Sequence, residues 1–144
     1  MNTLKLRPLE IEYHISIMPY EIDVAGIVSN ITYIRWLENM RVMILEKHFP
    51  IVNMLNNGIL PTLGKTEIEY RKPLTFFNKV TGKMWVSSIG EKKIVAEAEF
   101  LVGDSLHAIA SQVGFLVDKK TMRSINIPEE IKELYDNWDK QQTM

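Results

Sequence analysis

Residues 21–41 read EIDVAGIVSNITYIRWLENMR, and within this segment an irregular loop leads into a helix. The first part mixes acidic residues and glycine with single apolar residues, which is typical of a loop. Apolar residues then recur at helical spacing over residues 30–49. Ser29 or Asn30 can supply the N-cap oxygen, and Pro50 ends the helix. The segment therefore predicts a tight loop followed by one long, largely apolar helix.

The segments on either side of this helix have the two-residue period of β-strands. Residues 11–18 alternate between apolar and polar side chains, and residues 59–118 are also β-like, with a hairpin turn at 103–105. A short helical turn is expected at 52–56, and the tail from Pro128 has the acidic first turn of a C-terminal helix. The pattern predicts an α+β fold with an antiparallel sheet of about five strands.

The composition fits a single domain over residues 1–144, with 46% hydrophobic and 24% charged residues. The formal net charge of −1 gives no reason to expect a nucleic-acid partner. Because no run of about 18 apolar residues occurs, membrane insertion is not expected. The N-terminus lacks the apolar run of a signal peptide, so we expect a cytoplasmic protein.

Residues that commonly hold metals are sparse in this chain. Cysteine is absent, which excludes a disulfide framework, a thiolate zinc site and a cysteine nucleophile. The three histidines, His14, His48 and His107, lack the spacing of metal ligands. We therefore expect neither a metal site nor another cofactor.

The loop and helix of residues 21–41 resemble the signature of the 4-hydroxybenzoyl-CoA thioesterase family of hot-dog proteins. In that signature an acidic residue, an Asp two positions later and a Gly lead into a helix with Tyr, an aromatic residue, Glu and Arg. These places hold Glu21, Asp23, Gly26, Val28, Tyr33, Trp36, Glu38 and Arg41. The stretch IEYRKPLTFFNKV, the 94–117 hairpin and the IPEEI tail also fall where the family has them. The resemblance implies the hot-dog fold, in which the five-stranded antiparallel sheet wraps around one long central helix, with a C-terminal helix added.

The same resemblance implies a thioesterase that hydrolyses an acyl-CoA or acyl-carrier-protein thioester to free acid and thiol. Asp23 would act as general base or as nucleophile, since a carboxylate can do either beside a thioester. The N-terminus of the helix that starts near Asn30 would polarise the carbonyl. The expected substrate-binding residues are Gly26, Ile27, Val28, Ser29, Asn30 and Ile31.

Other interpretations of these residues remain open. Asp23 could be a solvated turn residue, and Ser29 and Asn30 could only cap the helix. Many family members carry His and then Asn between the glycine and the tyrosine, whereas this chain has Asn30 and Thr32, so a His-assisted mechanism is not expected. A hot-dog dehydratase would need an Asp and His pair in a loop-to-helix arrangement for its acid/base chemistry, and we find no such pair in this sequence.

The alternative from a different class is a non-catalytic acyl-binding or assembly module, against which the presence of both Asp23 and Gly26 argues. Five strands around one helix leave sheet surface uncovered, so we expect a homodimer or a homotetramer.

Overall fold

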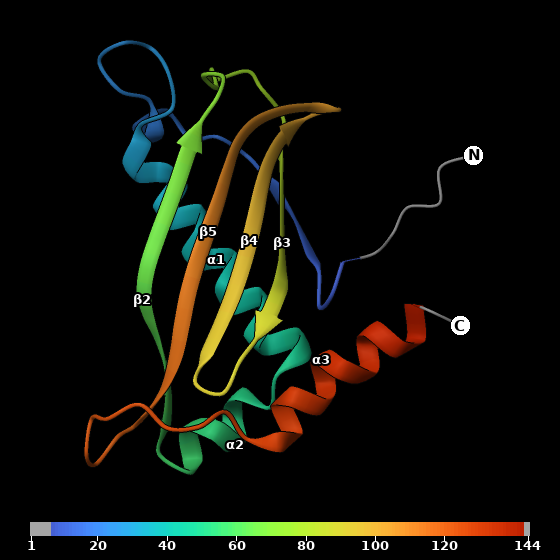
Figure 1. The fold of residues 1–144 in the computed structure, drawn as a ribbon. Helices are drawn as coiled ribbons and strands as arrows, with labels where there is room; N and C mark the ends of the chain where they lie inside the picture. Colours follow the sequence, from blue (N-terminus) through green and yellow to red (C-terminus); the bar gives the residue numbers. More distant parts are fainter. Residues whose placement is uncertain (1–6, 143–144) are drawn as a thin grey trace.

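The computed structural model describes residues 7–142 as one five-stranded sheet with helices (Figure 1). Every strand pair is antiparallel, and the strand order is β1-β3-β4-β5-β2. In chain order the elements are β1 (Ile11–Ile15), the 3-10 helix η1 (Pro19–Glu21), α1 (Asn30–His48), α2 (Ile51–Asn56), β2 (Ile59–Tyr70), β3 (Val80–Ile89), β4 (Lys93–Val102), β5 (Ser105–Asp118) and α3 (Glu129–Gln142). The predicted five strands, long helix and C-terminal helix are confirmed.

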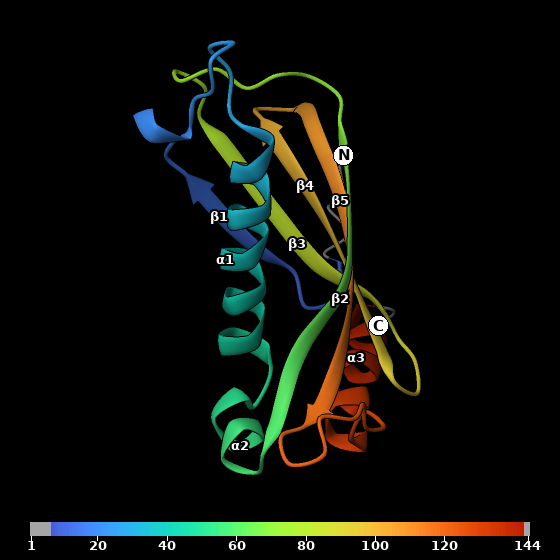
Figure 2. The same ribbon diagram turned by 90° about the vertical axis from the view of Figure 1, so that its left-hand side faces the viewer.

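The sheet curves around α1, which lies along its concave face (Figure 2). The buried side of α1 carries Tyr33, Trp36, Leu37, Met40 and Ile44. The rings of Tyr33 and Trp36 lie 5.3 and 5.8 Å from that of Phe100 on β4, so aromatic packing fixes the N-terminal half of the helix. Helices α2 and α3 both lie at the end of the molecule opposite the 19–29 loop (Figure 1).

Gly82 on β3 allows α1 to approach the sheet closely. A Cβ atom at this position would lie 2.8 Å from the sulfur of Met40 and 3.3 Å from Cδ1 of Ile15. Glycine is therefore the residue that lets helix and strand meet without a clash. This contact contributes to the placement of α1 and hence of the loop that precedes it.

One boundary differs from the sequence prediction. Strand β1 ends at Ile15, although the alternating pattern continued to residue 18, and Ile17 stays buried without ladder bonds. Strand β2 contains Pro61, which is tolerated because β2 is an edge strand paired only with β5.

Candidate active site

The loop between η1 and α1 is a tight turn closed by an isolated bridge between Ile22 and Val28. Inside it, the Asp23 N–H donates to the Ile27 carbonyl at 2.8 Å, and the Gly26 N–H donates to the Asp23 carbonyl at 3.0 Å. Gly26 has φ +82°, in the left-handed region that favours glycine. The turn thus brings the chain back on itself, with Asp23 on one side of the bridge and the start of α1 on the other.

The Asp23 carboxylate is exposed and only half engaged. Its Oδ1 accepts hydrogen bonds from the N–H groups of Ala25 at 2.8 Å and Ile27 at 3.4 Å. Within residues 7–142, Oδ2 has no hydrogen-bond donor. One oxygen therefore orients the side chain while the other faces solvent, which is the arrangement a general base or nucleophile needs.

Ser29 is the N-cap of α1, and its Oγ accepts from the Ile31 N–H at 3.4 Å. The N–H groups of Val28 and Ser29 donate to the carbonyls of Leu74 and Glu21, both at 2.8 Å. Of the segment Val28–Ile31, the Asn30 N–H is the one without an acceptor in the described part of the chain. The first N–H of a helix points outward from the positive end of the helix dipole. Asn30 is therefore the best placed donor for a carbonyl oxygen.

Glu21 holds the loop together from inside. Its side chain is 8% exposed, and Oε1 accepts from the Met18 N–H at 2.8 Å. Its carbonyl accepts from the Ser29 N–H and, at 3.5 Å, from the Thr32 hydroxyl. This burial shows that Glu21 is not a solvent-exposed surface acid. Glu21 orders the backbone on both sides of Asp23.

Tyr70, at the end of β2, supports the first residue of α1. Its hydroxyl donates to the Asn30 carbonyl at 3.2 Å, and its ring lies 5.0 Å from that of Tyr33. Burial and the neighbouring Tyr70 raise the pKa of Tyr33 to about 12, and burial also raises the pKa of Tyr70. Both phenols stay protonated near neutrality, so Tyr70 remains a donor. Its side chain is a part of the site that the sequence did not reveal.

Exposed apolar side chains surround the same end of the molecule. Phe77 is 89% exposed and packs edge to face against Phe76 in the β2–β3 connection, whose Leu74 carbonyl holds the Val28 N–H. Tyr20 and Val24 are also exposed. The Asp23 carboxylate and the free Asn30 N–H therefore lie at an end of the molecule that exposes several apolar side chains. No group of three side chains able to hold a metal ion is found among the described residues.

Comparison with known proteins places this chain in a family. The profile of the thioesterase-like superfamily matches residues 17–134, which include the whole loop and all of α1. The chain belongs to the thioesterase-like superfamily. Among proteins with curated functions, none matches this superfamily member. No helix within residues 7–142 is long and apolar enough to cross a membrane.

Solved structures show the same fold. The DHNA-CoA thioesterase from Staphylococcus aureus is 20% identical, with a TM-score of 0.79, and the match covers 93% of this chain and 91% of that chain. The probable thioesterase YbaW from Escherichia coli is also 20% identical, with a TM-score of 0.78 over 90% and 97% of the two chains. The 1,4-dihydroxy-2-naphthoyl-CoA thioesterase Slr0204 from Synechocystis is 13% identical, with a TM-score of 0.77 over 90% and 98%. The hot-dog fold of this thioesterase-like protein is therefore established.

Proposed function

We propose that this protein hydrolyses acyl-CoA thioesters to a free acid and CoA, with Asp23 as the catalytic carboxylate and the Asn30 N–H as the donor to the carbonyl oxygen. The observation that carries the proposal is the pairing of these two free groups at the ends of one closed turn. Residues facing each other across an antiparallel bridge lie about 5 Å apart between Cα atoms. The Ile22–Val28 bridge therefore keeps Asp23 close to the start of α1.

The two groups complement each other in thioester hydrolysis. Asp23 Oδ2 can take a proton from water as the water attacks the carbonyl carbon, or it can attack that carbon itself to give a mixed anhydride that water then opens. In both routes negative charge develops on the carbonyl oxygen, where the Asn30 N–H and the helix dipole stabilise it. Collapse of the tetrahedral intermediate breaks the C–S bond and releases CoA as the thiolate.

The remaining predicted substrate-binding residues have backbone roles in this proposal. Gly26 lets the loop bend and leaves the space beside it free of a side chain. No neighbouring heavy atom would lie within 4 Å of a Cβ atom at this position, so that space is open to the substrate. Ile27 positions Asp23 through its carbonyl, and Ser29 and Ile31 form the capped first turn. Val28 anchors the loop to Leu74. CoA as the carrier is favoured by the names of two structural relatives, which are CoA thioesterases.

We also propose that the active form is a homo-oligomer, either a dimer or a tetramer. Strand β2 lies at the edge of the sheet with one side of its ladder unpaired, and Leu63 on it is exposed. Ile31 and Ile34 on α1 are exposed as well. Light scattering on the purified protein tests this, and a monomer at micromolar concentration would contradict it.

Thiol release from a panel of short, long and aromatic acyl-CoAs tests the proposed activity. Hydrolysis of at least one member supports it and begins to define the acyl group. If no acyl-CoA reacts, the same groups are tested on acyl-carrier-protein thioesters. Activity only on the carrier-protein thioesters would show that the substrate is carried by acyl-carrier protein and not by CoA. Inactivity on both kinds of thioester would favour the non-catalytic acyl-binding module.

A further inference from the structure

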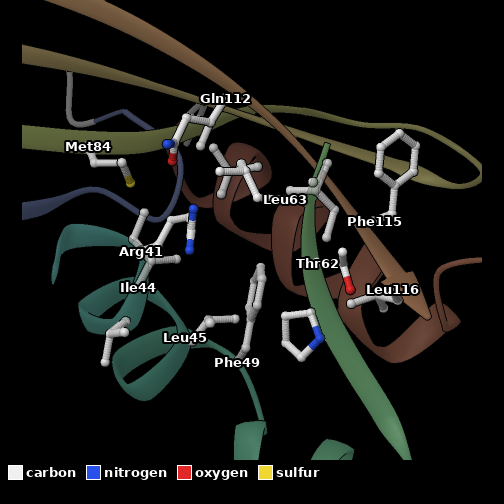
Figure 3. A pocket seen from close by; sticks show the side chains of 16 residues that line it. Arg41, Ile44, Leu45, Phe49, Thr62, Leu63, Met84, Gln112, Phe115 and Leu116 are labelled. Carbon is white, nitrogen blue, oxygen red and sulfur yellow. The ribbon is translucent and has the colours of Figure 1, made fainter. Parts of the chain in front are cut away.

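A second candidate site lies under the C-terminal half of α1, away from Asp23. A cavity of about 130 Å³ opens between this half of the helix and strands β2, β3, β4 and β5, and Figure 3 shows the side chains around it. Most of these side chains are apolar, among them Ile44, Leu45, Phe49, Met84 and Leu116. An engineered apolar cavity of about 150 Å³ binds benzene, so this one has room for roughly six carbon atoms.

Gln112 on β5 is a polar residue in this apolar lining. It is 3% exposed, and its Nε2 donates to the Thr66 hydroxyl at 3.1 Å. Its Oε1 is buried and has no hydrogen-bond partner in the part of the chain that the structure describes. A buried amide atom without a partner is costly, and native proteins usually satisfy it. Gln112, which lines the cavity, therefore carries one unused hydrogen-bonding position.

Arg41 supplies a second polar group. Its guanidinium pairs with Glu38 at 3.3 Å on the helix surface, and in Figure 3 its side chain points toward Gln112. A hydroxyl matches both groups, because it donates to the Gln112 carbonyl oxygen and accepts from the guanidinium. A carboxylate would pair with Arg41 but would place its oxygens against that carbonyl. The polar end of the cavity thus suits a hydroxyl group.

The cavity is also within reach of the thioester site for a long acyl chain. Arg41 is 11 residues beyond Asn30, which is about 16 Å at the helical rise. Each C–C bond is about 1.5 Å long and advances an extended chain by roughly 1.3 Å, so a chain of about 12 carbons spans this distance. Along the way α1 exposes Ile31, Ile34 and Val42, which are spaced to follow one side of the helix.

We propose that this cavity receives the far end of a fatty acyl chain of about 12 carbons, and that Gln112 together with Arg41 selects chains with a hydroxyl group there. Gln112 is then a specificity-determining residue, distinct from the catalytic Asp23. The inference rests on the proposed thioesterase function, because it assumes that the carbonyl of the same chain lies at Asn30.

The test compares kcat/KM for two matched pairs of substrates: dodecanoyl-CoA with 12-hydroxydodecanoyl-CoA, and hexanoyl-CoA with 6-hydroxyhexanoyl-CoA. We expect the parent protein to prefer the hydroxylated C12 substrate by about tenfold, the effect typical of one buried hydrogen bond. Gln112→Met keeps the side-chain length and removes the amide, so it should abolish this preference. Ser111→Ala, on the neighbouring residue outside the cavity lining, should keep it.

Three results would overturn the inference. The parent could hydrolyse both C12 substrates equally well, which would leave the cavity with no role in hydroxyl selection. The preference could survive in Gln112→Met, or it could occur only in the C6 pair, which would contradict the reach along α1. Should Gln112→Met fail to fold, Arg41→Met gives the same comparison at a half-buried position and should reduce the preference.

Calorimetric titration with the free acids separates this inference from the proposed activity. Binding of 12-hydroxydodecanoate about tenfold tighter than dodecanoate, with the difference lost in Gln112→Met, supports the cavity assignment whether or not thioesters are hydrolysed. Equal binding in a protein that does hydrolyse acyl-CoAs would overturn the inference and leave the proposed function intact.

Discussion

Replacing Asn30 with proline would remove the proposed carbonyl-polarising N–H and little else. Asn30 is the first residue of α1, where proline is favoured because its missing N–H would have no intrahelical acceptor. The preceding residue must be extended, and Ser29 already has φ −62° and ψ 141°. The Asn30 carbonyl, which accepts from Tyr70, is kept. The substitution therefore removes one donor while the helix start stays compatible.

The size of the effect follows from that single donor. Loss of one donor to a developing oxyanion lowers kcat by about 10²–10³-fold, whereas a compatible proline changes stability by about 1 kcal/mol or less. Asn30→Ala is the matched control, because it removes the same side chain and keeps the N–H. Thiol release at saturating acyl-CoA gives kcat for both variants, and thermal unfolding reports their stability. A folded Asn30→Pro variant with a kcat within about threefold of Asn30→Ala would refute the assignment of this N–H.

Three further predictions concern the loop, the core and the pH dependence of stability. Gly26→Ala should lower stability by about 1–3 kcal/mol, measured by urea unfolding, because alanine is strained at φ +82°; an unchanged midpoint would contradict this. Gly82→Ala should cost about 1–3 kcal/mol through its clash with Met40, and Met40→Ala in the same chain should recover part of that loss; strictly additive effects would argue against the contact. Tyr33 keeps its proton up to a pKa of about 12 in the folded state, whereas the unfolded chain loses it near pH 10, so the free energy of unfolding should fall between these values. In Tyr33→Phe that part of the fall should disappear.

The sequence predicted the elements well because their signals are local. The Ser29 cap, the break at Pro50 and the strand periodicity each depend on a few neighbouring residues, and α1 begins and ends within a residue of the prediction. The orientation of α1 was harder to predict. Ile34 and Leu37 are three residues apart and therefore neighbours on the helix surface, yet Leu37 is buried and Ile34 is exposed. Apolar residues occur around much of this helix, so periodicity alone could not select the buried face.

The site was predictable only in part for a similar reason. Asp23 and the start of α1 are close in sequence, so the resemblance could indicate both. The sequence could not show which N–H group at the start of α1 lacks an acceptor, because the Val28 N–H donates to the carbonyl of Leu74, which lies far along the chain. Likewise, Gln112 lies in an ordinary strand pattern, and its unpaired amide oxygen becomes visible only when β5 is placed against α1.

The catalytic role of Asp23 is tested most directly by comparing turnover of the parent with Asp23→Asn on the best acyl-CoA substrate. Asparagine keeps an oxygen that can accept from the Ala25 N–H, so the loop should hold its shape while the free carboxylate oxygen is lost. Asp104→Asn, in the exposed β4–β5 turn, is the matched control for the change of charge. We expect kcat to fall by about 10²-fold or more in Asp23→Asn and to stay at the parental value in Asp104→Asn. Near-parental turnover in a folded Asp23→Asn protein would remove Asp23 from the mechanism.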